Sequence, residues 1–482
     1  MRYGLRPGAW WTMLLVTASG LACDSSDPSP TAPVTDPDSA VRAIISDFGL
    51  APLPSIPYPD DNRHNPSRIA LGQLLFFDPI LGGESAPWVK TAAGEDPYRF
   101  RANDMACATC HHPTFGFADG RPLSAGVSGA RFRDTDLGPA RVVPGPSIIS
   151  GVPLGIVPRN APSIFNTAFN GLDSPDPRSN SFMFLDGRVT EGLEAQAILP
   201  ITSRDEMAGD AYGADVAQDS VTARIRAITE YVARFAQAFA GEINDAADLD
   251  ISHIGRAIAA YEREIITPGS RYDRFVSGEF RAFNDQERLG FEVFFGKGLC
   301  GDCHSGPMLS DFTMRVQGVG DDYESVHPGF EGKNGEGGDF GRFHADPDQF
   351  IDQKYAFRTL TVRMVEQTGP YFHSGSARTL REAVEFYNRG GLGPQDISDA
   401  TLADAGVVRD PSIRPLDLTS DEMDAIVAFM KTTTAPVRRG PSGLDLTAVP
   451  ERVPSGLLPP GIPTPDRPGP YLSPRSAHPI RW

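Results

Sequence analysis

Apolar side chains recur at helical spacing in well-bounded stretches of the chain. One stripe is made of Ile254, Ala257, Ile258, Tyr261 and Ile265, and the turn residues 267–270 end it. Two further helices are expected to begin at capping boxes, one at Thr379 and one at Thr419, and the first stops at Gly390. No stretch alternates apolar and polar residues for long, and the glycine- and aspartate-rich residues 318–348 are typical of loops. The pattern predicts a mainly α protein with long loops.

Two apolar segments in opposite halves of the chain echo one another. Residues 74–79 read Leu-Leu-Phe-Phe-Asp-Pro, and residues 290–296 read Gly-Phe-Glu-Val-Phe-Phe-Gly. The echo predicts two related domains, residues 41–275 and residues 276–436, of ordinary domain size. The proline-dense residues 437–482 are expected to form an extended tail that wraps the surface.

The first residues predict export. Arg2 and Arg6 precede an apolar run that is too short for a comfortable membrane span, so residues 1–22 are expected to be a signal peptide. The small and apolar residues before Cys23 resemble a bacterial lipoprotein cleavage box, although Gly20 stands where that box usually has Leu. We therefore expect a lipidated Cys23, a flexible tether over residues 23–40, and a location on the periplasmic side of a bacterial membrane. The alternative is ordinary signal cleavage, with Cys23 left as a spare thiol.

Acidity narrows the range of partners. The formal charge is −18, and loss of Arg2 and Arg6 with the leader makes it −20. Such a charge disfavours nucleic acid and anionic membrane surfaces, so the lipid at Cys23 is the membrane contact that we expect. It suits docking by the basic patch of a small redox protein.

Two copies of the pattern C-x-x-C-H lie nearly two hundred residues apart. They are Cys107-Ala-Thr-Cys110-His111 and Cys300-Gly-Asp-Cys303-His304. In this pattern both thiols attach to a haem and the histidine binds its iron. A lone C-x-x-C also fits a zinc half-site or a dithiol redox pair. The chain has five cysteines, and only Cys23 lies outside the motifs, so no thiol remains to complete such a site. The sequence predicts two covalently bound c-type haems.

The residues around these motifs match one family in order and spacing. The chain resembles the bacterial di-haem cytochrome c peroxidases and their relative MauG at residues 71–79, 117–120, 159–163, 186–188, 193–196, 206–207, 370–375 and 385–391. The resemblance covers residues from about 69 to 433. It implies two c-type cytochrome-like haem domains. Peroxide would react at the N-terminal haem, and electrons would arrive through the C-terminal haem.

The resemblance also assigns roles around the N-terminal haem. His111 would hold the iron, and Glu206 would take and return the proton as peroxide is cleaved. Gln196 and Pro200 would shape the pocket. Read without the family, Glu206 is one of many acidic residues, and only its spacing from Gln196 and Pro200 singles it out.

Two positions depart from the family pattern. Many members close the N-terminal haem with a histidine, but Val127 holds that place and valine cannot bind iron, so an open haem is expected. His112 is expected to point away from the iron, toward the surface. Relatives have a Trp between the haems where this chain has Leu185. Transfer between the haems would then need direct tunnelling or another aromatic side chain, for which Phe184 is the candidate.

The C-terminal haem would hang on His304 and take its sixth ligand from Tyr387. The resemblance implies this ligand, because MauG has a Tyr and other members a Met at that place. Helical spacing alone gives Tyr387 a packed position beside Leu380 and Val384, and this alternative stays open. A bound tyrosinate is hard and anionic, so it would lower the reduction potential of this haem.

Calcium is one of two open interpretations of a third site. The family holds a calcium ion between its domains with an Asn and two backbone carbonyls, which correspond to Asn160, Thr368 and Pro370. Oxygen ligands of this kind suit calcium. The other interpretation is that Asn160 only makes hydrogen bonds within its loop.

Three functions follow, in order of preference. The first is an exported di-haem peroxidase that reduces hydrogen peroxide to water with electrons from a small cytochrome c or cupredoxin. The second is a MauG-like oxidase that uses high-valent haem to modify a protein or a small molecule; Val127 and Tyr387 favour it, and Leu185 does not. The third is an electron carrier or sensor without catalysis, which the presence of Gln196 and Glu206 disfavours.

Overall fold

The computed structural model describes residues 38–82, 90–91, 94–95, 105–118, 120, 123–126, 155–157, 159–170, 182–208, 214–320, 339–457 and 459–460. Helices dominate this part of the chain, so the mainly α prediction is confirmed. The predicted leader, most of the tether including Cys23, and Val127 lie outside the described residues. Within those residues no helix combines the length and the apolar character needed to cross a membrane.

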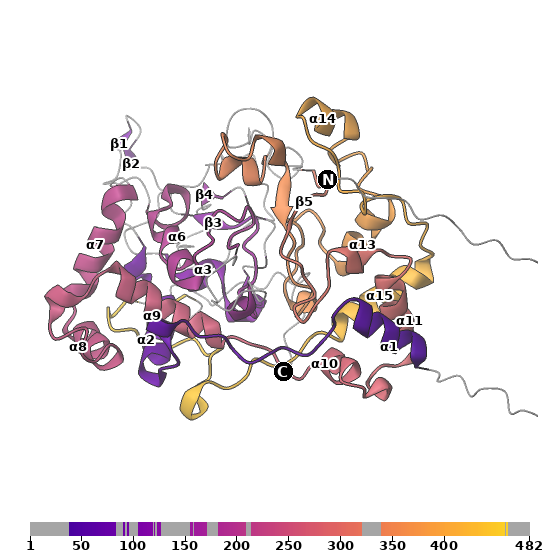
Figure 1. The fold of residues 1–482 in the computed structure, drawn as a ribbon. Helices are drawn as coiled ribbons and strands as arrows, with labels where there is room; N and C mark the ends of the chain where they lie inside the picture. Colours follow the sequence, from indigo (N-terminus) through magenta and orange to yellow (C-terminus); the bar gives the residue numbers. More distant parts are fainter. Residues whose placement is uncertain are drawn as a thin grey trace, which may run out of the picture.

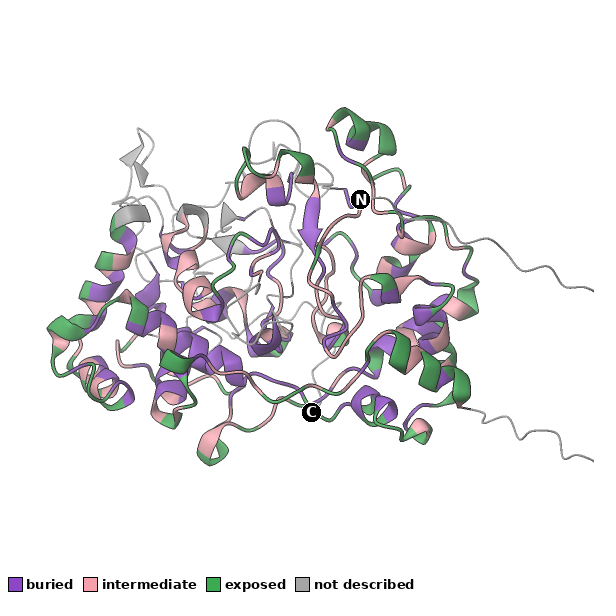
Figure 2. Ribbon diagram, in the orientation of Figure 1, coloured by how far each residue is buried: buried purple, intermediate pink, exposed green. Residues whose placement is uncertain are grey.

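The helices form two lobes that lie side by side (Figure 1). The first lobe contains α2 (Pro66–Phe76), α3 (Cys107–Cys110), α5 (Leu193–Gln196), α6 (Leu199–Thr202), α7 (Ala214–Arg226), α8 (Thr229–Ala238) and α9 (Ile251–Glu264). The second contains α1 (Ser39–Asp47), α10 (Arg271–Val276), α11 (Asp285–Phe295), α13 (Leu380–Asn388), α14 (Asp399–Asp404) and α15 (Ser420–Lys431). Each lobe has its own cluster of buried apolar side chains. The buried faces of α2 and α9 are visible in the first lobe (Figure 2).

Each lobe is built on one close helix pair. In the first lobe α2 crosses α9 at Gly72, where a Cβ atom would lie 1.9 Å from the carbonyl oxygen of Ala257. In the second lobe α11 crosses α15 at Gly290, where a Cβ atom would also lie 1.9 Å from a carbonyl oxygen, that of Ala425. Only glycine permits backbones to approach so closely. The echo between residues 74–79 and 290–296 thus follows two helices that pack in the same way.

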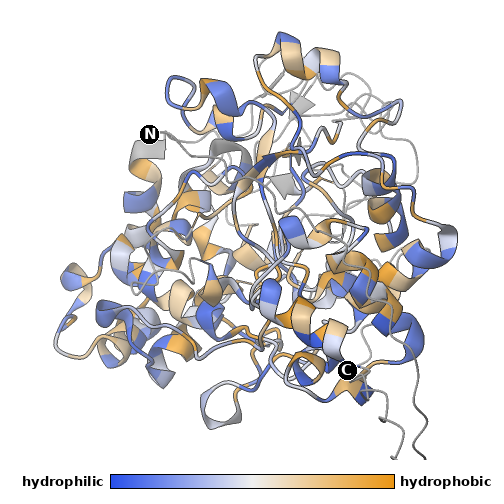
Figure 3. Ribbon diagram, turned by 45° about the vertical axis from the view of Figure 1, so that its right-hand side comes forward, coloured by the Kyte–Doolittle hydropathy of each residue, from blue (hydrophilic) through white to orange (hydrophobic). Residues whose placement is uncertain are grey.

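The three helices expected from the sequence are present. The stripe that begins at Ile254 lies on α9, whose apolar residues are buried. Figure 3 shows hydrophobic and hydrophilic residues interspersed along the helices. Thr379 caps α13 and Thr419 caps α15, and in both capping boxes the hydroxyl accepts the N–H of the glutamate three residues later at 3.2 Å. These predictions succeeded because caps and stripes are local signals.

The described strands are short and pair in three antiparallel ladders. They are β1 (Lys90–Thr91) with β2 (Gly94–Glu95), β3 (Ala125–Gly126) with β4 (Gly155–Ile156), and β5 (Met314–Val316) with β6 (Ala356–Arg358). In the last ladder Met314 faces Arg358 and Val316 faces Ala356. Residues 339–348, in the C-terminal part of the segment predicted as a loop, hold one short 3-10 turn at Arg342–His344.

A small turn recurs in both lobes. The N–H of Met183 donates to the carbonyl of Val189 at 2.7 Å, and the N–H of Tyr371 donates to the carbonyl of Ala377 at 2.7 Å. The second residue of each turn has a left-handed backbone, with φ 64° at Phe184 and 69° at Phe372. A helix begins a few residues after each turn, α5 after the first and α13 after the second. The two lobes therefore share a second structural feature besides the C-x-x-C-H motif.

Both ends of the described chain cross between the lobes. Helix α1 lies beside α11 in the second lobe, and residues 51–60 then run across to the first lobe (Figure 1). After α15 the chain crosses back, and Leu446 and Val453 are buried in the first lobe's core. The predicted domain boundaries differ from this packing, since residues 41–50 join the second lobe. Tail residues 437–457 run along the first lobe, and two of their side chains, Leu446 and Val453, are buried in its core.

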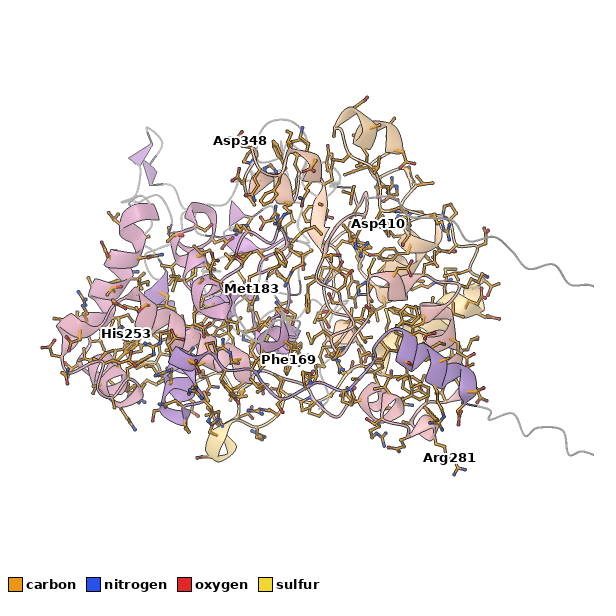
Figure 4. The ribbon with its side chains drawn as sticks, in the orientation of Figure 1. Phe169, Met183, His253, Arg281, Asp348 and Asp410 are labelled. Carbon is orange, nitrogen blue, oxygen red and sulfur yellow. The ribbon has the colours of Figure 1, made fainter. Side chains whose placement is uncertain are left out.

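The lobes meet through apolar and backbone contacts. Phe169 from the first half packs with Met308 from the second, and Figure 4 labels Phe169 between the lobes. The N–H of Asn160 donates to the carbonyl of His373 at 2.7 Å, and the N–H of Arg358 donates to the carbonyl of Leu185 at 2.8 Å. Each lobe thus gives one strand-like residue to the turn of the other lobe, so the contacts are reciprocal.

Candidate functional site

The N-terminal C-x-x-C-H motif forms α3 and aims its histidine inward. The N–H of His111 donates to the carbonyl of Cys107 at 2.9 Å, which closes the turn. The ring Nδ1 of His111 lies 3.1 Å from the carbonyl oxygen of Phe117. Because Nδ1 is held in this way, Nε2 is the nitrogen left to face the cavity. Phe117 presents its carbonyl from a left-handed backbone with φ 54°.

The C-terminal motif repeats this arrangement. The N–H of His304 donates to the carbonyl of Cys300 at 2.8 Å, and its Nδ1 lies 3.0 Å from the carbonyl oxygen of Leu309. Leu309 also has a left-handed backbone, with φ 49°. Phe117 and Leu309 could not be predicted as site residues, because a residue that acts through its carbonyl leaves no side-chain signature. Phe117 follows its histidine by six residues and Leu309 follows its histidine by five, so aligning the two motifs without a gap does not superpose them.

The N-terminal motif opens onto a cavity between α3 and α5. The cavity encloses about 1600 Å³ of empty space, the solvent at its mouth included. Cys107, Cys110 and His111 line it together with Gln196, Pro200 and Glu206. The structure brings together the site residues that the sequence proposed for the N-terminal haem.

Glu206 is presented by a π-helical turn. The turn spans Arg204–Ala208, and the N–H of Ala208 reaches back five residues to the carbonyl of Ser203 at 2.8 Å. Turns of this kind occur mostly at functional sites. Glu206 is half-buried and reaches the cavity, and Gln196 and Pro200 come from α5 and α6 just before it.

The residues present fit a covalently bound haem in this cavity. Cys107 and Cys110 keep a partly exposed surface although they lie within the lobe. Burial, with Glu262 nearby, raises the pKa of the Cys107 thiol. Buried polar atoms of Ser124 and Arg358 line the cavity and have no hydrogen-bond partner in the described part of the protein. The two thiols lining the cavity could bind the vinyl groups of a haem, and the unpartnered polar atoms could bind its propionates.

Glu262 is a second carboxyl in the cavity wall that the sequence did not single out. It is 5% exposed, and burial raises its pKa to about 8, with Arg263 opposing the shift. The group therefore carries a proton at neutral pH. Its position on α9, among apolar residues, hid it in the helical stripe.

Residues 182–188 form the cavity wall nearest the second lobe. Phe184 and Leu185 both line the cavity, as does Met183, which Figure 4 labels. The guanidinium of Arg188 lies 3.9 Å from the centre of the Phe184 ring. Leu185 thus lines the cavity at the position where the family resemblance predicts a Trp, and Phe184 is the aromatic side chain beside it.

Tyr387 faces the thiols of the C-terminal motif. The buried apolar residues of α13 are Leu380, Val384 and Phe386, whereas Tyr387 is only half-buried. Burial raises the pKa of Tyr387, and the charges of Cys303 and Cys300 act in the same direction. The hydroxyl also shares a hydrogen bond with Gln317. Tyr387 therefore lies near the cysteines of the C-terminal motif, and iron binding by this residue stays a prediction.

Two further expectations have different outcomes. Asn160 is buried and donates its N–H to His373, which places it next to the segment that carries Thr368 and Pro370. Calcium binding there stays a prediction. His112 was expected at the surface, and this is wrong. It is 8% exposed and accepts the N–H of Thr114 at 3.2 Å, and burial lowers its pKa to about 4.

Known proteins with similar sequences decide the family. Residues 66–281 match the family model described as di-haem cytochrome c peroxidase. The cytochrome c551 peroxidase of Pseudomonas aeruginosa is 30% identical over 67% of this chain and 72% of its own length. The chain belongs to the di-haem cytochrome c peroxidase family. It is an oxidoreductase, and membership of the family implies two c-type haems.

Other relatives place the chain within the same family. The methylamine utilization protein MauG of Methylorubrum extorquens is 27% identical over 79% of this chain and 82% of its own length. The crystal structure of a MauG-like protein associated with microbial copper homeostasis covers 83% of this chain and 97% of its own, with a TM-score of 0.58 and 24% identity. At that identity the likeness supports the fold. Peroxidases and MauG proteins thus both stand among the relatives of this di-haem protein.

Proposed function

We propose that the protein is an exported di-haem peroxidase that reduces hydrogen peroxide to water in the N-terminal cavity. The observation that carries this proposal is the convergence of Glu206, Gln196 and Pro200 on the cavity that His111 also lines. A haem held there supplies the iron and the electrons. The side chains of the cavity then have to handle the protons and position the peroxide.

Glu206 is suited to moving the proton. Its carboxylate would accept the proton of one peroxide oxygen and return it to the other. Two electrons delivered through the bound haem and two further protons would complete the reduction of peroxide to two waters. Gln196 carries both a donor and an acceptor, so its amide orients peroxide beside Glu206. The ring of Pro200 has no hydrogen-bonding group and keeps that side of the cavity apolar. Glu262 holds a further proton in the same cavity.

Electrons are proposed to enter through the C-terminal haem, held by Cys300, Cys303 and His304. The donor would be a small cytochrome c or cupredoxin, for which the charge of −18 provides an attractive surface. Export by the leader and a lipid on Cys23 would place the protein where such donors meet peroxide.

One experiment tests the peroxidase proposal directly. The fully oxidised protein is mixed with hydrogen peroxide while its visible spectrum is followed, and reduced cytochrome c is then added. We expect the cytochrome to be oxidised over many turnovers. A haem spectrum altered by peroxide that persists and does not respond to the cytochrome would contradict the proposal.

The second candidate is a MauG-like oxidase that acts on a protein or a small molecule. The orientation of Tyr387 toward Cys300 and Cys303 favours it, because a tyrosinate ligand would stabilise an oxidised C-terminal haem. Leu185 in the wall between the haem sites disfavours it. The same mixing experiment separates the two, since the oxidase would keep its altered spectrum until an organic substrate arrives.

A further inference from the structure

One guanidinium in the N-terminal cavity lacks a counter-charge. Arg358 lines the cavity and is 8% exposed, yet in the described part of the chain no carboxylate forms an ion pair with it. Its Nη1 donates to the carbonyl of Phe182 at 2.7 Å, and its Nε has no partner. A buried cation without an anionic partner is strongly destabilising. An anionic group is therefore missing from this wall.

The neighbouring acids are already engaged. Asp186 accepts Arg159 at 2.6 Å and Arg188 at 2.7 Å, and Asp339 accepts the Nη2 of Arg159 at 2.8 Å. Two carboxylates thus balance two arginines, and Arg358 is left over. Burial lowers the pKa of Arg358 to about 10, with Asp186 opposing the shift, so the guanidinium stays charged at neutral pH.

Arg358 also has a counterpart in the other lobe. The N–H of Arg358 bonds to Leu185 in the turn of the first lobe, just as the N–H of Asn160 bonds to His373 in the turn of the second. At one of the two reciprocal contacts the side chain is a neutral amide, and at the other it is a cation that faces the N-terminal cavity. The second lobe thereby supplies a positive charge to the haem site of the first lobe.

We propose that Arg358 binds a carboxylate inside the N-terminal cavity, and that this carboxylate is a propionate of the haem attached at Cys107 and Cys110. The guanidinium fork matches a carboxylate, and a haem brings two of them. Arg358 is then a positioning residue that joins the N-terminal haem to the second lobe. The inference needs the haem but not peroxidase activity.

The test is a redox titration of the purified di-haem protein, without peroxide. Arg358→Gln removes the charge, so the propionate is no longer neutralised and the reduced haem is destabilised. We expect the reduction equilibrium constant of the N-terminal haem to fall at least tenfold, or about 59 mV for one electron. Arg358→Lys should retain most of the wild-type value. The C-terminal haem is the internal reference.

Arg342→Gln is the matched control. Arg342 is also buried and donates to the carbonyls of Asp186 and Gly187, but it does not line the cavity, so its loss should leave the potential unchanged. If Arg358→Gln and Arg358→Lys lower the melting temperature alike without moving the potential, Arg358 only supports the fold and the proposal is wrong. Redox titrations with added sodium acetate distinguish a haem propionate from a small exchangeable anion as the partner of Arg358. A wild-type potential that depends on acetate, with only that dependence lost in Arg358→Gln, would overturn the propionate assignment.

Discussion

Glu206 is the cavity side chain whose chemistry can be removed with the least change of shape. Glu206→Gln keeps the size and the polar end of the side chain, but the amide cannot accept the peroxide proton. We expect the rate of peroxide cleavage to fall about 10²- to 10⁴-fold, with unchanged haem spectra in the resting protein. Stopped-flow mixing with peroxide measures this rate. Glu451→Gln, an exposed carboxylate away from the cavity, is the control, and equal rates in both variants would refute the role of Glu206.

Tyr387 offers an equally conservative change at the other haem site. Tyr387→Phe keeps the ring beside Phe372 and Phe386 and removes only the hydroxyl. If the oxygen binds iron, its loss removes an anionic ligand, and the potential of the C-terminal haem should rise by on the order of a hundred millivolts. Redox titration and the visible spectrum measure the change. Tyr371→Phe is the control, because the Tyr371 hydroxyl donates to the carbonyl of Val365. If Tyr387→Phe leaves the haem spectrum as unchanged as Tyr371→Phe does, Tyr387 is a packing residue and does not bind iron.

At the scale of elements, the repeated plan explains why the two haem sites differ. Pro200 follows the first residue of α5, Leu193, by seven residues. Tyr387 follows the first residue of α13, Leu380, by the same number. Pro200 lies in α6, after a two-residue break that α13 lacks, and it lines the N-terminal cavity. The position at which Tyr387 is predicted to give the second haem a phenol oxygen thus carries, in the first lobe, a ring without a donor atom.

This correspondence can be tested by exchanging the side chain. In Pro200→Tyr we expect a phenol oxygen to close the N-terminal haem, seen as a change from a high-spin to a low-spin spectrum. The peroxide reaction should slow in proportion to the closed fraction. Pro200→Ala, which removes the ring without adding a donor, should stay high-spin. A high-spin spectrum in both variants would show that the two positions do not correspond.

Some helices and site residues could be predicted from the sequence, and others could not. Helices α9, α13 and α15 were predictable because stripes and capping boxes depend on neighbours in the chain. The convergence of Glu206 and Gln196 with His111 was available only through the family resemblance. The carbonyls of Phe117 and Leu309, the buried Glu262 and the cation Arg358 were not found. Each acts through backbone geometry or through a partner far along the chain, which periodicity does not encode.

At the scale of the whole molecule, the lobes are tied together at several points. Helix α1, from the N-terminal part of the chain, packs in the core of the second lobe, and Leu446, from the C-terminal part, packs in the core of the first. Each core therefore includes side chains from both parts of the chain. Arg159 spans the contact, because it bonds Asp186 in the first half and Asp339 in the second. The two C-x-x-C-H motifs therefore belong to lobes that pack on shared segments, an arrangement that would suit the proposed electron transfer between the haems.

The Arg159–Asp339 pair makes this contact sensitive to acid. Burial acts to raise the pKa of Asp339, but the charge and hydrogen bonds of Arg159 outweigh it and hold the pKa well below its usual range. A carboxyl with a lowered pKa contributes stability above its unfolded pKa, about 3.9, and loses it as the pH falls through the folded value. Asp339→Asn should therefore cost about 3 kcal/mol between pH 5 and 7, because Arg159 loses a buried partner.

The pH dependence of that cost is the decisive measurement. Melting temperatures of the wild type and Asp339→Asn should differ by a constant amount from pH 7 to 5. The difference should begin to shrink below about pH 4, where the carboxyl of the unfolded wild type takes up a proton, and should go on shrinking as the pH falls toward the lowered pKa of the folded state. Asp348→Asn removes an exposed carboxyl at the edge of the molecule (Figure 4) and should match the wild type throughout. A gap that stays constant down to pH 3 would mean that Asp339 acts by its shape. In that case the charge of Arg159 is balanced by Asp186, and the ion pair across the lobes is not what holds them together.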